Sequence, residues 1–306
     1  GSGDDSVSFA STDEMNDGDT IAFGSGADTL AMTAASNVAL TGTVDLDDIT
    51  GLETIVVNGS TGTDVVTLQF QATAATAADA ITVDATQLTG ASDTITMTNN
   101  SGTQPTTFTI TGGVNGDTLA GAGAAAGDTI DGGAGNDQIG GGGGNDSLIG
   151  GAGSDTITIA AGTVNASGGD ANDTIAVAAT LSAADTISGG AGTDTMTMTP
   201  GGTAADAAFA NVSSIETLSL TAGAATLGAN AQAAGVTTIA MDTAGGGADT
   251  LTATAFTTGL TVALGDGNGD IVTLSNADNI VSFASTDELN DGDTIAFGSG
   301  ADTLAM

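Results

Sequence analysis

Three aspartates spaced nine residues apart have the residue type and the surroundings of ligands for a hard cation. Asp137, Asp146 and Asp155 each occupy the sixth position of the pattern Gly-Gly-x-Gly-x-Asp-x-apolar-x, and the three units follow one another without a gap from residue 132 to residue 158. Glycines allow the backbone to turn through positive φ, so that carbonyl oxygens and the aspartate converge on one point. Calcium takes about six to eight oxygen ligands of this kind at roughly 2.3–2.6 Å. The units therefore predict calcium-binding turns.

Short strands must hold these turns in place. The last three residues of each unit can form a strand whose apolar side chain points inward, and Ile139, Leu148 and Ile157 recur nine residues apart as this requires. A flexible Gly-rich linker, the alternative interpretation, has no reason to keep that spacing. The units predict a parallel β-roll.

A single unit supplies too few oxygens for calcium, so turns from two units should share an ion. Two strands and two turns make one coil of 18 residues, which stacks each unit on the next but one. The predicted pairs are Asp137 with Asp155 on one edge and Asp128 with Asp146 on the other, while Asp155 and Asp173 continue the first edge. Val164 stands where an aspartate is expected opposite Asp146, so the site there should be incomplete.

Looser copies of the unit extend the pattern along the chain. Asp117 precedes the regular units by a two-residue slip, and Asp173 returns in phase 18 residues after Asp155. The complete set of candidate metal-binding residues is Asp117, Asp128, Gly133, Gly135, Asp137, Gly142, Gly144, Asp146, Gly150, Ala152, Asp155, Gly168, Asp170, Asp173, Asp185, Asp194 and Asp270. Three outer aspartates, Asp19, Asp93 and Asp249, are equally well explained as turn-capping residues.

The charge balance of the chain also favours cation binding. The 306 residues include 37 acidic residues and no Lys, Arg or His, which gives a formal net charge of −37. Self-repulsion of this size opposes compaction, so the neutralising charge must come from solution. Only 12% of the residues are charged and 40% are hydrophobic, the opposite of a disordered acidic tail. Acidity that serves solubility alone is the alternative.

Composition excludes several classes of function. The absence of Cys excludes disulfides and thiolate metal sites. A chain without basic residues offers no surface for nucleic acid, and no apolar run approaches the ~20 residues of a membrane span. A Ser or Thr nucleophile lacks its usual activating base, and the 33 Asp and 4 Glu show no isolated pair suited to glycoside hydrolysis. We therefore expect no enzyme.

A long-range repeat spans almost the whole chain. Residues 4–32 and 278–306 are identical at 26 of 29 positions, at an offset of 274 residues. We infer one period of a tandem array followed by the opening of the next. Two similar edge hairpins of a self-contained domain are the alternative. If the two segments are copies, they should adopt the same conformation.

Outside the nonapeptides the sequence indicates strands and turns. Residues 64–70, 80–83 and 93–98 alternate apolar residues with Thr at period two. The one helix expected is brief, capped by Thr203 and running through Phe209. The expected organisation is a β-rich solenoid segment at 1–111, a calcium β-roll at 112–197, a second β-rich segment at 198–277, and the start of the next repeat at 278–306. The fold class is all-β, a parallel β-roll or β-solenoid.

With these units the chain resembles the RTX (repeats-in-toxin) family and, in style, its bacterial surface-layer proteins and giant repeat adhesins. The strand around Ile215-Glu216-Thr217-Leu218, set between calcium-type turns, looks like the lattice-forming part of the surface-layer proteins. The resemblance implies type I secretion, folding triggered by external calcium, several bound ions, and ligation by the sixth-position Asp plus carbonyls of positions one to four. Toxin pore and catalytic segments are not recognisable, so neither a toxin nor an enzyme is supported.

Three functions remain open on this basis. The first is a structural repeat of a long secreted protein that self-associates into an extracellular fibre or surface layer. The second is a calcium-stiffened adhesin stalk, whose binding to cell-surface glycans would lie in regions outside this sequence. The third is ice binding through Thr-x-Thr runs such as Thr195 and Thr197, although the sequence shows no regular coil-to-coil spacing of these runs.

Overall fold

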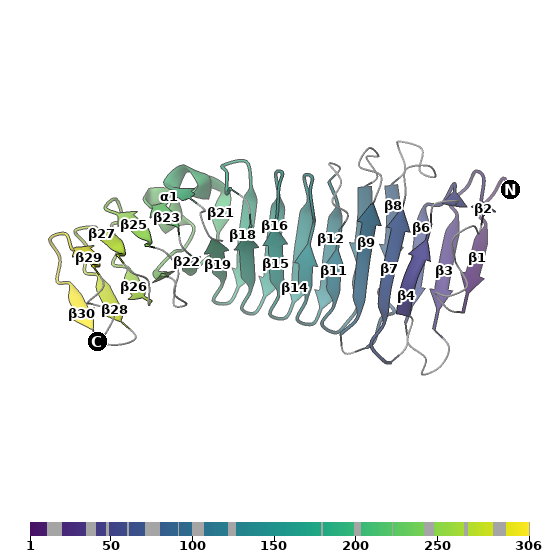
Figure 1. The fold of residues 1–306 in the computed structure, drawn as a ribbon, viewed down its shortest axis with the longest axis horizontal. Coiled ribbons are helices and arrows are strands. Elements are labelled where there is room, and N and C mark those ends of the chain that lie inside the picture. Colours follow the sequence, from purple (N-terminus) through teal and green to yellow (C-terminus); the bar gives the residue numbers. More distant parts are fainter. Residues whose placement is uncertain are drawn as a thin grey trace. The chain divides into compact units, whose positions relative to one another are not determined.

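The computed structural model is built almost entirely of short parallel strands (Figure 1). It describes residues 1–10, 20–34, 41–46, 49–59, 61–70, 80–90, 92–99, 107–121, 127–178, 180–198, 203–221, 223–241, 248–265, 269–283 and 292–305. These residues form two compact units, Gly1–Ser167 and Gly168–Met306. The predicted all-β parallel solenoid is therefore the observed fold class.

The first unit contains two parallel sheets, and the chain alternates between them. One sheet is formed, in spatial order, by β1 (Ser6–Phe9), β3 (Thr29–Thr33), β6 (Thr54–Asn58), β8 (Ala80–Asp84), β10 (Thr107–Thr111), β12 (Thr129–Ala134) and β14 (Ser147–Ala152). The other is formed by β4 (Thr41–Asp45), β7 (Val65–Phe70), β9 (Thr94–Asn99), β11 (Thr118–Ala120), β13 (Gln138–Gly140) and β15 (Thr156–Ile159). A small pair, β2 (Ile21–Ala22) and β5 (Ile49–Thr50), completes the unit.

In-register aliphatic columns form the core of this unit. The inward positions of the first sheet are Leu30, Ile55, Val83, Ile110, Ile130 and Leu148, each paired with the next. All six are buried. The period-two alternation of apolar residues and Thr explains this, because side chains on a strand point alternately to opposite faces. The 18-residue coil predicted for the nonapeptides is observed, with Ile139 beside Ile157 and Ile130 beside Leu148.

The second unit repeats the same principle. One of its sheets contains β17 (Thr174–Val177), β19 (Thr195–Met198), β22 (Thr217–Leu220), β24 (Thr238–Met241), β26 (Thr261–Leu264), β28 (Ile280–Phe283) and β30 (Thr303–Ala305). Another contains β20 (Thr203–Ala205), β23 (Ala224–Thr226), β25 (Thr250–Ala253), β27 (Ile271–Leu274) and β29 (Thr294–Ala296). β18 (Thr186–Ala191) pairs with β21 (Val212–Ser213), and β16 (Asn165–Asp170) spans the boundary between the units.

Threonines form a regular row on the outward side of this unit. Adjacent strands pair Thr174, Thr195, Thr217, Thr238 and Thr261 in succession. Strands in a sheet lie about 4.7–4.9 Å apart, so neighbouring hydroxyls recur at that interval. The structure therefore shows a regular coil-to-coil spacing of threonines, which the sequence did not show.

The helices differ from the sequence-based expectation. Thr203 belongs to β20 and caps no helix. A 3-10 helix, η2 (Asp206–Asn211), follows instead, and no side chain caps its N-terminus. An α-helix, α1 (Ala229–Ala233), was not expected. Its alanines favour helix, and Gly235 ends it at φ 107°. The sequence thus contained a helix signal, but one only five residues long. Among the described residues, no helix is long and apolar enough to cross a membrane.

The two near-identical segments share their strand pairing. In the first, Val7 of β1 pairs with Leu30 of β3, and in the second Val281 of β28 pairs with Leu304 of β30. Side-chain contacts repeat too, since Ala27 N–H donates to Asp4 Oδ1 at 2.9 Å and Ala301 N–H donates to Asp278 Oδ1 at 2.8 Å. Over their described residues the segments thus form the same coil.

Candidate metal-binding turns

A ladder of aspartates joins the turns of successive coils in the first unit. On one edge Asp117 N–H donates to Asp137 Oδ1 at 2.7 Å, and Asp137 N–H donates to Asp155 Oδ1 at 2.8 Å. On the other edge Asp128 N–H donates to Asp146 Oδ1 at 2.9 Å. The two predicted pairs, Asp137 with Asp155 and Asp128 with Asp146, are therefore neighbours. That each pair shares an ion stays a prediction.

Asp117 belongs to this ladder despite the two-residue slip. The expectation that the slip separates Asp117 from the regular coils is wrong, because Thr118 pairs with Gln138 in the register of the other coils. The extra residues lie in the connection after Gly121, part of which is outside the described residues. A solenoid absorbs such insertions in a turn, since only the strands must stay in register.

The second unit contains the same ladder with variations. Asp173 N–H donates to Asp194 Oδ1 at 2.8 Å, and Asp194 N–H donates to Glu216 Oε2 at 2.8 Å. Asp249 N–H donates to Asp270 Oδ1, also at 2.8 Å. A glutamate can therefore take the acceptor position of an aspartate.

These carboxylates are buried, and several of their oxygens accept no hydrogen bond. Asp117, Asp137 and Asp194 are at most 2% exposed. Asp117 Oδ1, Asp137 Oδ2 and Asp194 Oδ2 have no hydrogen-bond partner. A buried carboxylate without a compensating partner is costly. Each of these oxygens therefore fits a cation.

Burial also shifts the acidity of the ladder. Burial raises the pKa of the Asp117 carboxyl to about 6, although the hydrogen bond from Gly113 N–H opposes the shift. Burial likewise raises the pKa of Asp93, Asp137, Asp146 and Asp194. The cause is the same at each residue, because removal from water disfavours the charged carboxylate. A cation beside these groups would reverse the shift.

The first glycine of the unit leaves room for the carboxylate. A Cβ on Gly132 would lie 2.4 Å from Asp137 Oδ2 and 2.6 Å from the carbonyl oxygen of Gly150. At Gly168 the corresponding distances are 2.2 Å to Asp173 Oδ2 and 2.3 Å to Gly189 O. A carboxylate oxygen of one coil and a carbonyl oxygen of the next thus face the same small space. Oxygens gathered in this way match the donor set of calcium.

The second and fourth glycines are required by backbone conformation. Gly133 and Gly135 have φ of 97° and 125°, a region that L-residues with a Cβ avoid. Gly142 and Gly144, at the same two positions of the next unit, also have positive φ, 80° and 129°. In the unit that begins at Gly168, Ala171 adopts φ 78° at the fourth position. The turn conformation is thus kept even where the glycine is lost.

Carboxylates alone do not assemble a site. Among the described residues, no group of three or more His, Cys, Asp or Glu side chains could hold a metal ion. Any ion must therefore take its remaining oxygens from turn carbonyls, as the resemblance implies. Gly150 O is placed for this role, whereas the Ala152 carbonyl accepts the Gly135 N–H at 2.7 Å.

Other candidate residues have different surroundings. Asp170 is exposed at the end of β16 and lies outside the buried ladder. Asp185 is buried, but its Oδ2 accepts the Ser182 N–H at 2.9 Å and the Ser182 hydroxyl at 3.1 Å, so it closes its own turn. Val164 is buried at the position where an aspartate was expected.

The ladder extends to aspartates that were not included among the candidates. Asp93 Oδ1 accepts Asp64 N–H at 2.8 Å, and Asp270 N–H donates to Asp293 Oδ1 at 2.9 Å. Asp93 and Asp249, for which turn capping was an equal alternative, are both buried in the ladder. Asp19 lies outside the described residues. The signal was the tripeptide Asp-Thr-apolar, which begins most of the coils.

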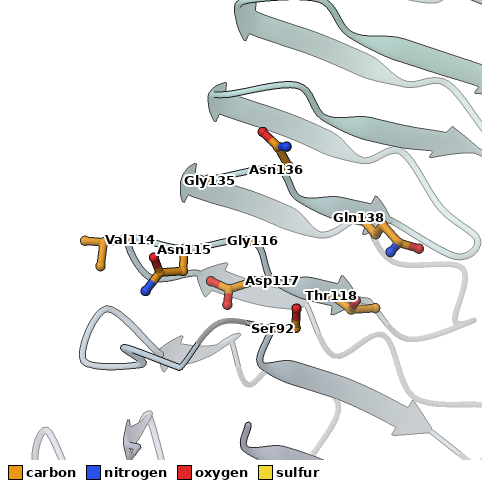
Figure 2. Close-up of a pocket in the computed structure, with 9 residues that line it drawn as sticks. All are labelled: Ser92, Val114, Asn115, Gly116, Asp117, Thr118, Gly135, Asn136 and Gln138. Carbon is orange, nitrogen blue, oxygen red and sulfur yellow. The ribbon is translucent and has the colours of Figure 1, made fainter. Parts of the chain in front are cut away.

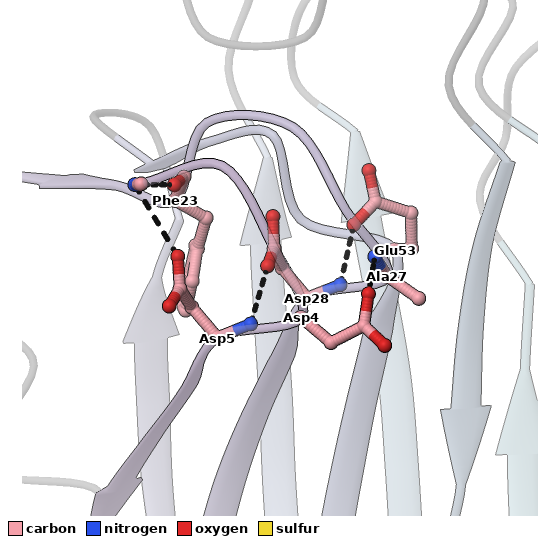
Figure 3. A network of polar contacts seen from close by, with 7 residues as sticks. Asp4, Asp5, Phe23, Ala27, Asp28 and Glu53 are labelled. Carbon is pink, nitrogen blue, oxygen red and sulfur yellow. Dashed lines mark hydrogen bonds and ion pairs between the residues drawn. The ribbon is translucent and has the colours of Figure 1, made fainter.

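The first turns of the chain form the same network with a mixture of acids (Figure 3). Asp28 Oδ1 accepts the Asp5 N–H at 2.8 Å, and Glu53 Oε2 accepts the Asp28 N–H at 2.9 Å. Asp28 is fully buried, and its Oδ2 has no hydrogen-bond partner. Its turn reads Phe23-Gly-Ser-Gly-Ala-Asp28, which keeps the second and fourth glycines of the unit. This degenerate pattern could have identified Asp28 in the sequence.

A hollow of about 510 Å³ lies along the turn edge of the first unit (Figure 2). Asp117 contributes its carboxylate, and the remaining lining is mostly uncharged and polar. The lining residues are Ser92, Val114, Asn115, Gly116, Asp117, Thr118, Gly135, Asn136 and Gln138. The hollow therefore lies beside the turn that carries Asp117.

Asparagines form a second ladder that the sequence analysis missed. Asn136 Oδ1 accepts Ser154 N–H at 2.8 Å, and Asn145 Oδ1 accepts Thr163 N–H at 2.9 Å. In the second unit Asn172 Oδ1 accepts Thr193 N–H at 2.8 Å. Asn at the fifth position of the unit thus caps the next coil.

Comparison with known proteins identifies the turns by sequence. A family model described as the RTX calcium-binding nonapeptide repeat (4 copies) matches residues 122–157 and 167–197. Comparison with curated protein sequences gave no significant match. The matched residues contain Asp128, Asp137, Asp146, Asp155, Asp173, Asp185 and Asp194.

Proposed function

Since the chain carries RTX calcium-binding nonapeptide repeats, with calcium as their cofactor, we propose that it is a calcium-folded structural repeat of a secreted protein. The observation that carries the proposal is the ladder of buried carboxylates, in which oxygens of Asp117, Asp137 and Asp194 lack a hydrogen-bond partner. The chain has no Lys, Arg or His to neutralise them. Repeats of this family are typical of secreted bacterial proteins, and extracellular calcium would then supply the missing charge.

The two oxygens of a ladder carboxylate have different roles in the proposed ion site. At Asp137, Asp146 and Asp155 the Oδ1 atom accepts a backbone N–H of the neighbouring coil, which orients the carboxylate. The other oxygen, such as Asp137 Oδ2, is then turned toward the space beside Gly132. Calcium supplies positive charge when bound, and folding and binding become one event because the site does not exist in the unfolded chain.

A mechanical role fits these residues better than a catalytic one. Catalytic nucleophiles need an activating base or a lowered pKa. The chain has no His, Lys or Cys, and the large hollow beside Asp117 is lined mostly by amides and hydroxyls. We therefore propose that the protein is not an enzyme.

The larger assembly is proposed to be an extracellular fibre or surface layer made by self-association. Support comes from the 274-residue offset between two segments that form the same coil. Solenoid coils contact only their neighbours, so additional periods lengthen the stack without changing the fold. Outward rows of uncharged threonine provide faces on which copies of so acidic a chain can approach each other.

A monomeric adhesin stalk is the competing structural role. Both roles require calcium, but only the first requires contact between copies. Sedimentation and electron microscopy of the purified chain in calcium distinguish them. Filaments or sheets support the first role, and single rods support the stalk.

Ice binding is a second candidate function, and one observation favours it. The outward row Thr174, Thr195, Thr217, Thr238 and Thr261 is in register from strand to strand. A flat array of regularly spaced hydroxyls can order water. Thermal hysteresis of the calcium-loaded chain, compared with a Thr217→Lys variant, tests this role. The absence of hysteresis in the parent chain would exclude it.

The central proposal is tested by circular dichroism with and without chelator. In chelator the nonapeptide region should lose β signal, and added calcium should restore it. Magnesium is the matched control, because it is smaller and dehydrates reluctantly. A spectrum that does not change in chelator would contradict calcium-dependent folding.

A further inference from the structure

Asn279 occupies a ladder position at which most other coils have a carboxylate. Its backbone N–H donates to Asp302 Oδ1 at 2.9 Å, as the aspartate amides do in other coils. Leu260 N–H donates to Asn279 Oδ1 at 3.1 Å, which determines the orientation of the side-chain amide. The residue is fully buried. Asn279 is therefore an isosteric replacement of the ladder aspartate with one acceptor exchanged for a donor.

The exchanged group contacts oxygens of the turn. Asn279 Nδ2 donates to Ala277 O at 2.7 Å, to Ser275 O at 3.2 Å and to Asp302 Oδ1 at 3.0 Å. Ser275 and Ala277 precede Asn279 by four and two residues. Gly133 and Gly135 precede Asp137 by the same intervals. The amide of Asn279 thus donates to turn carbonyls that a carboxylate could not bind directly.

A second turn of the same unit is closed by backbone donors. Asp206 Oδ1 accepts N–H groups of Gly228 at 2.7 Å, Ala231 at 3.0 Å and Asn230 at 3.1 Å. These amides lie at the start of α1. The fold therefore supplies this oxygen with three hydrogen-bond donors. Asp206 Oδ1 thus has protein donors and no need of a cation.

The buried polar side chains of residues 203–283 differ in their hydrogen bonding from Asp137 and Asp194 of the nonapeptides. Within the described part of residues 203–283, every buried side-chain oxygen and nitrogen has a hydrogen-bond partner, whereas Asp137 Oδ2 and Asp194 Oδ2 have none. The strand pairing itself does not require Asn, because the equivalent residue of the first segment is Asp5, which makes the same contact to Asp28 at 2.8 Å. Asp5 is exposed whereas Asn279 is fully buried, so the uncharged amide occurs where the side chain is removed from water.

We propose that the described part of residues 203–283 forms a calcium-independent block within the calcium-dependent repeat, and that Asn279 closes its turn with an amide in place of a cation. The inference rests on the proposed function, since it assigns the ions to the remaining aspartate turns. It predicts that one substitution, Asn279→Asp, converts a hydrogen-bonded turn into a calcium-requiring one. The block would keep part of the chain folded when calcium is low.

Hydrogen–deuterium exchange of the full chain in chelator and in calcium tests this. In chelator, amides of residues 248–283 should stay protected while those of 128–157 exchange freely. Asn279→Asp should lower the protection of residues 260–283 in chelator by about tenfold or more, and calcium should restore it. Calorimetry should then show one more bound calcium than in the parent chain. The control is Asn276→Asp, since Asn276 is exposed and uses only its Oδ1, which accepts Ser299 N–H at 2.9 Å.

Each outcome bears on the inference. If residues 203–283 of the parent chain exchange as freely in chelator as 128–157, no calcium-independent block exists. If Asn279→Asp stays as protected as the parent chain, the amide has no such role. If the variant is unprotected even in calcium, the turn cannot take a cation and the inference is likewise wrong. Protection of 128–157 in chelator would instead contradict the proposed function and leave the assignment of Asn279 to be judged by its own variant.

Discussion

The backbone N–H of Asp137 donates to the Oδ1 of Asp155 at 2.8 Å, 18 residues further along the chain. Asp137 also accepts, through its own Oδ1, the N–H of Asp117 at 2.7 Å. Asp137 therefore joins its own coil to the coils before and after it, as a donor through its backbone and as an acceptor through its side chain. Substitution of one aspartate should disturb the coil before it as well as its own turn.

Asp137→Ala and Asp137→Asn should separate the two roles of the carboxylate. Both remove a calcium-binding charge, so both should lose calcium in a titration. Only Ala leaves the buried Asp117 N–H without an acceptor, which costs about 1–3 kcal/mol. In chelator the Asn variant should thus be the more stable of the two. Urea unfolding at fixed calcium and in chelator measures the difference, and equal stabilities would argue against the ladder.

Gly132→Ala should destabilise the calcium-loaded fold. The new Cβ would lie 2.4 Å from Asp137 Oδ2 and 2.6 Å from Gly150 O, and overpacking of this kind costs roughly 1–3 kcal/mol. Gly140→Ala is the matched control, because a Cβ there meets no atom within 4 Å. Denaturant midpoints in calcium should fall for the first variant and stay or rise for the second. A comparable loss in both would mean that the carboxylate is not packed against Gly132.

Val164→Asp should complete the turn opposite Asp146 and add one bound calcium. The same substitution should destabilise the chain in chelator, because Val164 is 2% exposed and a buried unpaired charge is costly. Val164→Ala removes the side chain without adding a ligand, so it should lose stability and gain no ion. Calorimetric stoichiometry decides the matter. An unchanged calcium number in Val164→Asp would contradict the predicted stacking of these turns.

Acid should stabilise the calcium-free fold and weaken calcium binding. The pKa of Asp117 is about 6 in the folded chain, above the ~3.9 of an unfolded aspartate. The ionised carboxyl therefore destabilises the fold fully above about pH 6, and this cost disappears as the pH falls toward about 4. Protons compete with calcium over the same range.

Two measurements check this pH dependence. In chelator, the β signal should increase as the pH is lowered from about 7 to about 5, and the apparent calcium affinity should decrease over the same interval. Asp117→Asn should reduce both changes, whereas Asp170→Asn, at an exposed aspartate, should leave them as they are. A calcium-free fold that loses stability on mild acidification would contradict the shifted pKa.

The sequence by itself determined the coil and its chemistry. The nine-residue spacing of Asp137, Asp146 and Asp155 predicted the 18-residue coil, the inward position of Ile139 and the pairing of Asp137 with Asp155. These features follow from local rules, because strand alternation and glycine turns depend on adjacent residues. The resemblance that identified calcium depended on the same local pattern.

Only the tertiary structure decided which polar groups are satisfied by the protein itself. Ladder partners lie 18 to 29 residues apart in an irregular series, so periodicity could not assign Asp93 and Asp249 to the ladder or leave Asp170 outside it. Asp206 is satisfied by amides of α1, and Asn279 by carbonyls that a carboxylate would repel. Whether a buried oxygen needs a cation depends on the donors that the fold brings beside it, and those donors come from distant parts of the sequence.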